Sequence, residues 1–254
     1  MSRRGGSRGR RANVPSFQME YYTPGPNFRG EPAAGTGEVF PTKFWPQNPD
    51  DEPMTIFHGR SINLAGHHVW RYTHIHMNNQ LLIMTDGSCA NNGTPDARGG
   101  CAFIYGPSLD FDQINARESF RLEDEGPFGD MYPQTSNRAE LRAVIAALRY
   151  RNWAVESFNS IVIATDSDYV TEGVTRWVRR WLQNGWRTRT GDQVENVDLW
   201  QCLLGEAERL WDSAIQVLFW KITRNLNQDA DELARRATRL PDQHHFVDHV
   251  DHSL

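Results

Sequence analysis

Short apolar runs and helical periodicities alternate along the chain from about residue 80 onward. Residues 81–85 form an apolar run of strand length, and residues 161–164 and 217–222 repeat that pattern. Runs of this length predict strands that are buried in a sheet. Two further strands are predicted near residues 101–105 and 118–122, after a loop rich in Gly, Asn and Pro.

Helical spacing separates these strands. In residues 137–153, Leu141, Val144, Ile145 and Leu148 fall at i, i+3, i+4 and i+7, which predicts an amphipathic helix. Residues 198–211 and 228–238 show the same spacing, and residues 169–182 form one or two further helices. In residues 198–211 and 228–238, the positions expected to face inward are Leu199, Cys202, Leu203, Leu210, Ala230, Leu233, Ala234 and Ala237. Three opening strands followed by alternating helices and strands predict an α/β fold with a mixed sheet flanked by helices.

The two ends of the chain differ in composition from this middle part. We predict a low-order, mostly irregular extension over residues 1–76, a main domain over 77–241 and a His-rich tail over 242–254. Residues 56–77 are less polar, and we expect them to pack as an appendage on the main domain. The tail carries four histidines among acids, and a disordered end is favoured over a metal-binding one.

Residues 1–12 hold five arginines among glycines. This Arg/Gly head could bind RNA, act as a nuclear address or serve as a mitochondrial presequence. A solvated tail with no further role is the equal alternative.

Composition and charge narrow the class of protein. Apolar residues make up 39% of the 254 residues, which supports a buried core. The net charge of -5 excludes a polycation, so any nucleic-acid surface must be a local basic patch. Three cysteines without a CxxC pair argue for a reducing compartment, and no apolar run is long enough to span a membrane. We expect an intracellular monomer without an obligate protein partner, in the nucleus or cytoplasm, with the mitochondrion as the alternative.

Four carboxylates occupy ends of the predicted elements. Asp86 and Asp166 each end a buried strand, whereas Glu140 and Asp231 lie in the first turns of two helices. Such positions can meet at one edge of an open sheet, where ligand crevices form. Each acid has an ordinary alternative as a turn residue, a capping residue or a favourable charge at a helix start. Only the four together indicate a site.

A cluster of four carboxylates favours a hard divalent cation, because the cation removes the repulsion between like charges. Mg²⁺ takes oxygen ligands and usually keeps waters and substrate phosphates in its shell. Two such ions can activate a water and stabilise the leaving oxygen of a phosphodiester. The reaction class that the cluster predicts is hydrolytic phosphoryl transfer.

Four motifs in order resemble the type 1 ribonuclease H family over residues 81–240. They are Thr85-Asp86-Gly87-Ser88, Thr135-Ser136-Asn137-Arg138-Ala139-Glu140-Leu141, Thr165-Asp166-Ser167-Asp168-Tyr169-Val170 and Asn227-Gln228-Asp229-Ala230-Asp231-Glu232-Leu233-Ala234. The resemblance implies a ribonuclease H-like fold with a five-stranded mixed sheet, and Asp86, Glu140, Asp166 and Asp231 as metal-binding catalytic carboxylates. It also implies two Mg²⁺ or Mn²⁺ ions, attack by a metal-activated water, and cleavage of the RNA strand of an RNA–DNA hybrid.

A basic, aromatic stretch resembles the handle of the bacterial form of this family. Residues 173–191 contain five arginines, three tryptophans and no acid. Arginine binds phosphate bidentately and tryptophan offers a stacking face. The substrate-binding residues expected here are Trp177, Arg179, Arg180, Trp181, Trp186 and Arg187. Trp177 and Trp181 could equally be core residues of an amphipathic helix, and we expect at least one Trp to face inward while the arginines face solvent.

The resemblance also implies residues that distinguish a hybrid from other duplexes through the RNA 2′-hydroxyl. Cys89, Asn92, Ser136 and Asn137 match positions that face the minor groove. Thr135 and Arg138 match positions near the DNA-strand phosphate, although Thr135 and Asn137 could simply be helix caps.

Three positions depart from the family pattern. The loop before the last helix lacks the usual histidine and carries Arg224, a catalytic candidate that can stabilise charge but cannot act as a base. Asp168 stands where a glutamine is common, and it could repel phosphate, adjust metal affinity or cap a helix. Leu182, Gln183 and Asn184 replace basic residues, which predicts weaker hybrid affinity. Residues 106–133 are longer and more acidic than the family requires and are expected to form a loop insertion around the third strand.

Two other functions compete with a hybrid-specific endonuclease. One is a non-catalytic ribonuclease H-like module that binds nucleic acid or protein, which the missing histidine and Asp168 leave open. The other is an exonuclease-type or mobile-element derivative of the fold, against which the handle motif argues.

Overall fold

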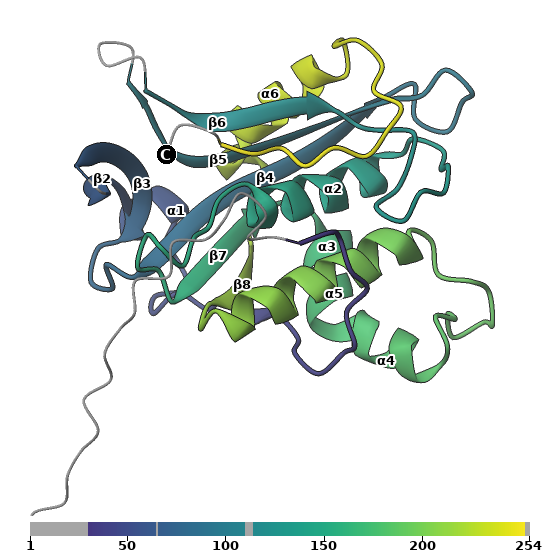
Figure 1. Cartoon of the computed structure of the whole chain (residues 1–254), viewed down its shortest axis with the longest axis horizontal. Coiled ribbons are helices and arrows are strands. Elements are labelled where there is room, and N and C mark those ends of the chain that lie inside the picture. The colour runs from purple at the N-terminus through teal and green to yellow at the C-terminus, as the bar shows by residue number, and fades with distance from the viewer. Residues whose placement is uncertain (1–29, 65, 110–113, 252–254) are drawn as a thin grey trace, which may run out of the picture.

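In a computed structural model of the protein, which describes residues 30–64, 66–109 and 114–251, the chain forms a mixed β-sheet with helices on both faces (Figure 1). The five strands expected from the sequence are β4 (Gln80–Ala90), β5 (Arg98–Leu109), β6 (Ile114–Arg121), β7 (Ser160–Thr165) and β8 (Gln216–Lys221). β4, β7 and β8 run parallel, whereas β5 and β6 are antiparallel to their neighbours. The Arg/Gly head lies outside the described residues.

The sheet has eight strands in the described part of the chain, so the expectation of five was too low. The extra strands come from the N-terminal extension. β1 (Thr42–Lys43) adds to β8 in parallel, and β2 (Phe57–Leu64) and β3 (His67–His74) form a hairpin. β3 pairs with the beginning of β4, whose later residues pair with β5 along the same edge. Between residues 30 and 76 the extension is therefore irregular only in part.

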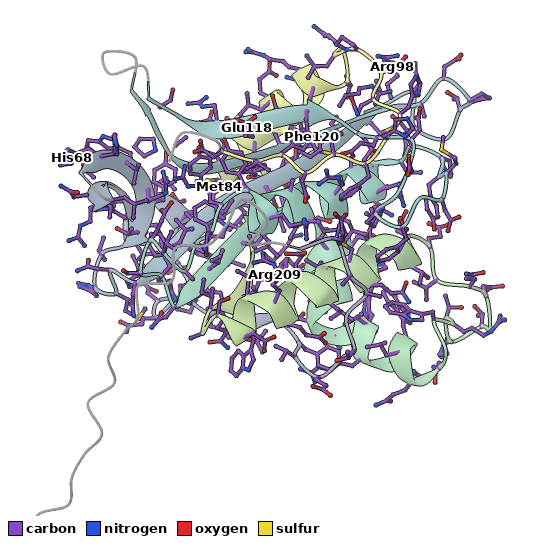
Figure 2. All side chains as sticks on the ribbon, viewed as in Figure 1. His68, Met84, Arg98, Glu118, Phe120 and Arg209 are labelled. Atoms are coloured by element: carbon purple, nitrogen blue, oxygen red, sulfur yellow. The ribbon has the colours of Figure 1, made fainter. Side chains whose placement is uncertain are left out.

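The core has two layers, one on each face of the sheet. Successive residues of β4 alternate between them, with Leu81 and Ile83 on one side and Leu82 and Met84 on the other. Met84 lies near the centre of the sheet in Figure 2. The alternation follows from the two-residue period of a strand, and because both faces are covered the strand reads as a continuous apolar run.

Helices cover both layers. α2 (Ser136–Arg149) and α5 (Val197–Asp212) pack on the first face, and α6 (Gln228–Ala237) packs on the second. The expected helices over residues 169–182 are α3 (Asp168–Glu172), a π-helical turn (Gly173–Trp177) and α4 (Val178–Gln183). A short α1 (Pro53–Ile56) precedes β2, and a 3₁₀ turn (Arg224–Leu226) precedes α6. No helix in the described ranges is long and apolar enough to cross a membrane.

The helix expected over residues 137–153 ends earlier, at Arg149. Trp153 nevertheless stays in the core, and its indole Nε1 donates a hydrogen bond to the carbonyl oxygen of Ala147 at 3.1 Å. The apolar spacing therefore continues past the helix, although the backbone has already turned.

The polar side of α2 is also buried, because its arginines pair with acids from distant segments. Arg142 pairs with Glu123, and both side chains are 1% exposed. Arg149 pairs with Glu206 of α5 and with Asp248 of the C-terminal tail. The expected acidic loop insertion is thus tied to the core at Glu123 rather than fully solvated. Buried pairs of this kind require a partner for every charge.

The C-terminal tail is packed on the domain, which contradicts the expectation of a disordered end. The backbone amide of Asp124 donates to the carbonyl oxygen of Gln243 at 3.1 Å, and that of Asp251 donates to Tyr150 at 3.2 Å. The ring of His249 stacks on Phe120 of β6, which is labelled in Figure 2, with centroids 3.8 Å apart. Arg149 of α2 helps to explain the docking, since its guanidinium pairs with Asp248 of the tail.

Candidate active site

Asp86 lies within β4, which continues to Ala90 and is longer than its apolar run predicts. Its side chain is largely buried, with 6% exposure. The next residue, Gly87, allows α2 to pack directly on the strand. A Cβ at Gly87 would lie 2.1 Å from the backbone nitrogen of Glu140, so a side chain does not fit there. This close approach brings Glu140 beside Asp86.

Glu140 is held at its place on α2 by a neighbouring strand end. The hydroxyl of Ser167, which follows β7, donates a hydrogen bond to Oε2 of Glu140. The same hydroxyl accepts a bond from the backbone amide of Val170 and caps the start of α3. One small side chain therefore joins the start of α3 to the carboxylate on α2.

Asp166 directly follows β7 and is tied to β4 through Asn227. The Nδ2 of Asn227 donates to Oδ1 of Asp166 at 2.8 Å and to the carbonyl oxygen of Thr85 at 3.0 Å. Asn227 is completely buried and immediately precedes α6. It therefore joins the middle of β4 and the residue after β7 to the start of the helix that carries Asp231.

Asp231 lies in the first turn of α6 and pairs with Arg224. The Nη2 of Arg224 donates to Oδ1 of Asp231 at 2.7 Å, and the Arg224 side chain is otherwise exposed. α6 reaches this position because Gly100 of β5 leaves room for its backbone. A hollow of about 540 Å³ opens beside the pair, lined by Arg224, Asn225, Gln228, Asp231, Glu232 and Arg235.

The electrostatics of the four acids show that they lie near one another. Burial, with the charges of Asp166, Glu140 and Asp231 adding to it, raises the pKa of Asp86 to about 8. The pKa of Glu140 is raised to about 7, mainly by burial, with Asp166 adding to the shift. The hydrogen bond to Asp231 raises the pKa of Arg224, and the negative charges of Asp231, Asp166 and Asp86 contribute to the shift. Because the charges of all three other carboxylates raise the pKa of Asp86, the four acids lie near one another in one negatively charged site.

The donor set fits hard divalent cations. All four acids offer carboxylate oxygens, and the raised pKa values of Asp86 and Glu140 show that their negative charge is poorly compensated by protein groups. Within the residues that the structure describes, no group of three or more His, Cys, Asp or Glu residues is placed to hold a metal ion by itself. Mg²⁺ usually takes only one or two carboxylates and completes its shell with water and phosphate, so an open arrangement is consistent with it.

The residues expected to face a minor groove border this site. Cys89 lies on β4 beyond Asp86 and is partly exposed, and Asn92 is exposed in the loop that follows. Ser136 and Asn137 begin α2 and are partly exposed. Thr135 is the cap of that helix, since its hydroxyl accepts a bond from the amide of Arg138 at 3.2 Å. These positions are accessible, and Thr135 serves the capping role that the sequence left open.

Arg138 contradicts its expected role as a phosphate contact. Its guanidinium is 2% exposed and forms a bidentate pair with Asp198 at 2.9 and 2.6 Å. It also lies over the ring of Tyr132, 4.0 Å from the centroid. The partner comes from α5, sixty residues later in the chain, and the sequence pattern does not show that pairing. Arg138 joins α2 to α5 instead of contacting a ligand.

The handle stretch divides as expected between core and surface. Trp181 packs against Trp200 with ring centroids 5.5 Å apart, and Trp186 also packs on the core, whereas Trp177 is 38% exposed. Arg179, Arg180 and Arg187 are exposed. Arg179 lies over Phe40 of the N-terminal extension, 4.0 Å from the ring centroid. The arginines are thus exposed on α4 and in the segment that follows it, while Trp181 and Trp186 fasten this stretch to the core.

Sequence reasoning gave no role to three residues that shape the site. Asn227 and Ser167 stand inside the quoted motifs; the available signals were that Ser167 directly follows Asp166 and that Asn227 directly precedes the last helix. Lys221 ends β8 opposite Thr165 and pairs with Asp168 at 2.8 Å. Asp168 therefore starts α3 with its carboxylate paired to a lysine, while Ser167 caps the helix.

Comparisons with known proteins show what this chain is similar to. A family model described as RNase H matches residues 78–239. A ribonuclease H from Hahella chejuensis (strain KCTC 2396) is 36% identical over 157 residues, which cover 60% of this chain and 88% of the relative. One from Sodalis glossinidius (strain morsitans) is 38% identical over 174 residues, or 65% and 88%. LC9-RNase H1, a solved type 1 RNase H with the type 2 active-site motif, is 27% identical with a TM-score of 0.42, covering 63% of this chain and 72% of that one.

Proposed function

Since the chain belongs to the ribonuclease H family, we propose that it is an endonuclease that hydrolyses the RNA strand of RNA–DNA hybrids. The observation that carries the proposal is the convergence of Asp86, Glu140, Asp166 and Asp231, whose charges act on one another from four different elements. A cluster with uncompensated negative charge favours a site for cations rather than a surface for binding alone.

We propose that the four carboxylates hold two Mg²⁺ or Mn²⁺ ions. Bound divalent ions supply a nucleophile at neutral pH and stabilise charge on the phosphate oxygens. The protein residues keep their donors in place: Ser167 orients Glu140, and Asn227 orients Asp166. Arg224 holds Asp231 and presents its exposed guanidinium to the phosphate, where it can stabilise charge without acting as a base.

Substrate selection is proposed to divide between two surfaces. Cys89, Asn92, Ser136 and Asn137 offer small polar groups at the edge of the cluster, suited to the 2′-hydroxyls of the RNA strand. Arg179, Arg180 and Arg187, with the exposed face of Trp177, offer a basic surface for the phosphates of the DNA strand. An RNA–DNA hybrid satisfies both surfaces, whereas a DNA duplex lacks the 2′-hydroxyls.

The test is a cleavage assay with end-labelled RNA–DNA hybrid, RNA duplex and single strands, each with Mg²⁺ or with chelator. We expect cleavage of the hybrid alone, lost with chelator and lost in Asp86→Asn. The matched control is Asp212→Asn, at the exposed end of α5, which should cleave as the wild type does. Cleavage that persists in Asp86→Asn would overturn the assigned site. Hybrid binding without cleavage by the wild type would favour a non-catalytic module instead.

A further inference from the structure

A second pocket lies at the edge of the sheet where the N-terminal extension meets β8. It has a volume of about 310 Å³, and its walls include Lys43, Phe44, Trp45, Pro46, Trp220 and Lys221. Pockets for small organic groups begin at about 300 Å³, so this one suits a single nucleoside-sized group and is too small for a duplex. Residues 43–46 lie outside the part of the chain that the family model matches.

The pocket presents an aromatic face to solvent. Trp45 is 77% exposed, the highest value among the large hydrophobic side chains described. The wall behind Trp45 is held in place by two contacts. The rings of Phe44 and Trp220 pack with centroids 5.0 Å apart, and the backbone amide of Phe44 donates a hydrogen bond to the carbonyl oxygen of Phe219 at 2.8 Å. An exposed indole on a rigid base is a stacking platform, and every nucleobase has a face that can stack on it.

Two lysines flank this face. Lys43 lies 5.9 Å from the centroid of the Trp45 ring and pairs with Glu172, while Lys221 pairs with Asp168 at 2.8 Å. Both ion pairs are partly exposed, and such pairs contribute little to stability. Glu172 also pairs with Arg176, so Lys43 can turn to a phosphate without leaving that acid alone.

The pocket adjoins the carboxylate cluster. Lys221 pairs in the sheet with Thr165, the residue before Asp166, so one wall of the pocket is one residue from a candidate catalytic acid. We propose that this pocket binds an unpaired nucleotide of a strand that continues past the active site, with its base on Trp45 and its phosphate at Lys43 or Lys221. The inference rests on the proposed function, because it assumes that the cluster receives nucleic acid.

The experiment measures equilibrium binding by fluorescence anisotropy with the full chain and chelator, so that no cleavage is needed. The probes are a blunt RNA–DNA hybrid and the same hybrid with about three unpaired nucleotides on the RNA strand or on the DNA strand. A further probe carries abasic units in the extension, which keep the phosphates and remove the bases. We expect one extended hybrid to bind at least about fivefold tighter than the blunt one, since that factor corresponds to one stacked base.

Trp45→Ala should reduce this ratio to about one, and the abasic extension should do the same in the wild type. Trp211→Ala, which truncates another exposed tryptophan on α5, should leave the ratio as it is. The RNA and DNA arms identify the strand that carries the nucleotide. A wild-type ratio of one on both strands, or equal losses in Trp45→Ala and Trp211→Ala, would overturn the inference. A failure of the proposed function shows separately, as absence of cleavage with Mg²⁺ whatever the binding ratio.

Discussion

Gly87→Ala tests how the site is assembled, because the added methyl group meets backbone and not a movable side chain. The new Cβ would lie 2.1 Å from the nitrogen of Glu140 and 2.3 Å from the carbonyl carbon of Ala139. Ordinary contact begins at 3.4 Å, so the helix must move away by about 1.3 Å. β4 is held at this point by β5, since Gly87 is paired with Cys101, so we expect the helix to move rather than the strand.

This displacement carries Glu140 with it. A shift of about 1 Å in a catalytic group can reduce the rate about 100-fold, which corresponds to about 2.7 kcal/mol of transition-state stabilisation. The same overpacking should lower the free energy of unfolding by about 1–3 kcal/mol. We therefore expect Gly87→Ala to remain folded at 25 °C but to lose about two orders of magnitude in kcat/KM on a labelled hybrid with Mg²⁺.

Gly66→Ala is the matched control. Gly66 has a positive φ of +91° in the hairpin turn, but nothing lies within 4 Å of its Cβ position. Alanine there costs about 1–2 kcal/mol of backbone strain without moving α2. Urea unfolding of both variants should show similar losses of stability, whereas only Gly87→Ala should lose activity. Near wild-type kcat/KM in Gly87→Ala would refute the reasoning that this packing positions Glu140.

Four other outcomes follow from named contacts. Asp86 has a folded-state pKa of about 8, so its contribution to stability is present below its unfolded pKa and lost as pH rises through 8. Metal-free Asp86→Asn should therefore have a higher melting temperature than the metal-free wild type at pH 8, measured by differential scanning fluorimetry. Arg138→Ala leaves Asp198 buried without its partner and should lower the urea-derived unfolding free energy by about 3–5 kcal/mol, and a loss below about 1 kcal/mol would contradict the pair's importance. Arg180→Ala should reduce the slope of log affinity against log salt by about 0.9 if it contacts one phosphate, and an unchanged slope would remove it from the interface. Burial lowers the pKa of His249 to about 3, so docking of the tail should weaken as pH falls below about 6.5, by about 2 kcal/mol at pH 5. Proteolysis of the tail should therefore be faster at pH 5 in the wild type, but not in His249→Phe.

The apolar pattern predicted the strands of the main domain because they lie between two layers of core, and its helices because each buries one apolar face. β4 shows why the boundaries did not follow. Its apolar residues end at Met84, but Asp86 to Ala90 continue the strand through pairing with β5. Hydropathy reports burial of side chains and carries no information on which backbone amides find partners. A polar stretch can therefore extend a strand without leaving a sign in the pattern.

The strands of the extension escaped prediction for a related reason. Most side chains of β2 are exposed, so its sequence lacks an apolar run. What orders the hairpin is a small number of anchors: Phe57 is fully buried, and Phe44 packs with it against Trp220 on the second face of the sheet. Two aromatic residues among many polar ones do not form a period, although they cover part of the core that α6 leaves open.

Charged residues locate the chemistry of the site, whereas uncharged residues determine its geometry. The acids could be identified from the sequence because each lies at a recognisable place in or beside its own strand or helix, and that place is read from neighbouring residues. Their convergence depends on Gly87 and Gly100, which admit two helices to the sheet, and on the hydrogen bonds of Ser167 and Asn227. Asn227 connects the middle of β4 and the residue after β7 to the start of α6. Because each of these contacts joins segments far apart in the chain, a single sequence identifies the acids but cannot show what holds them together.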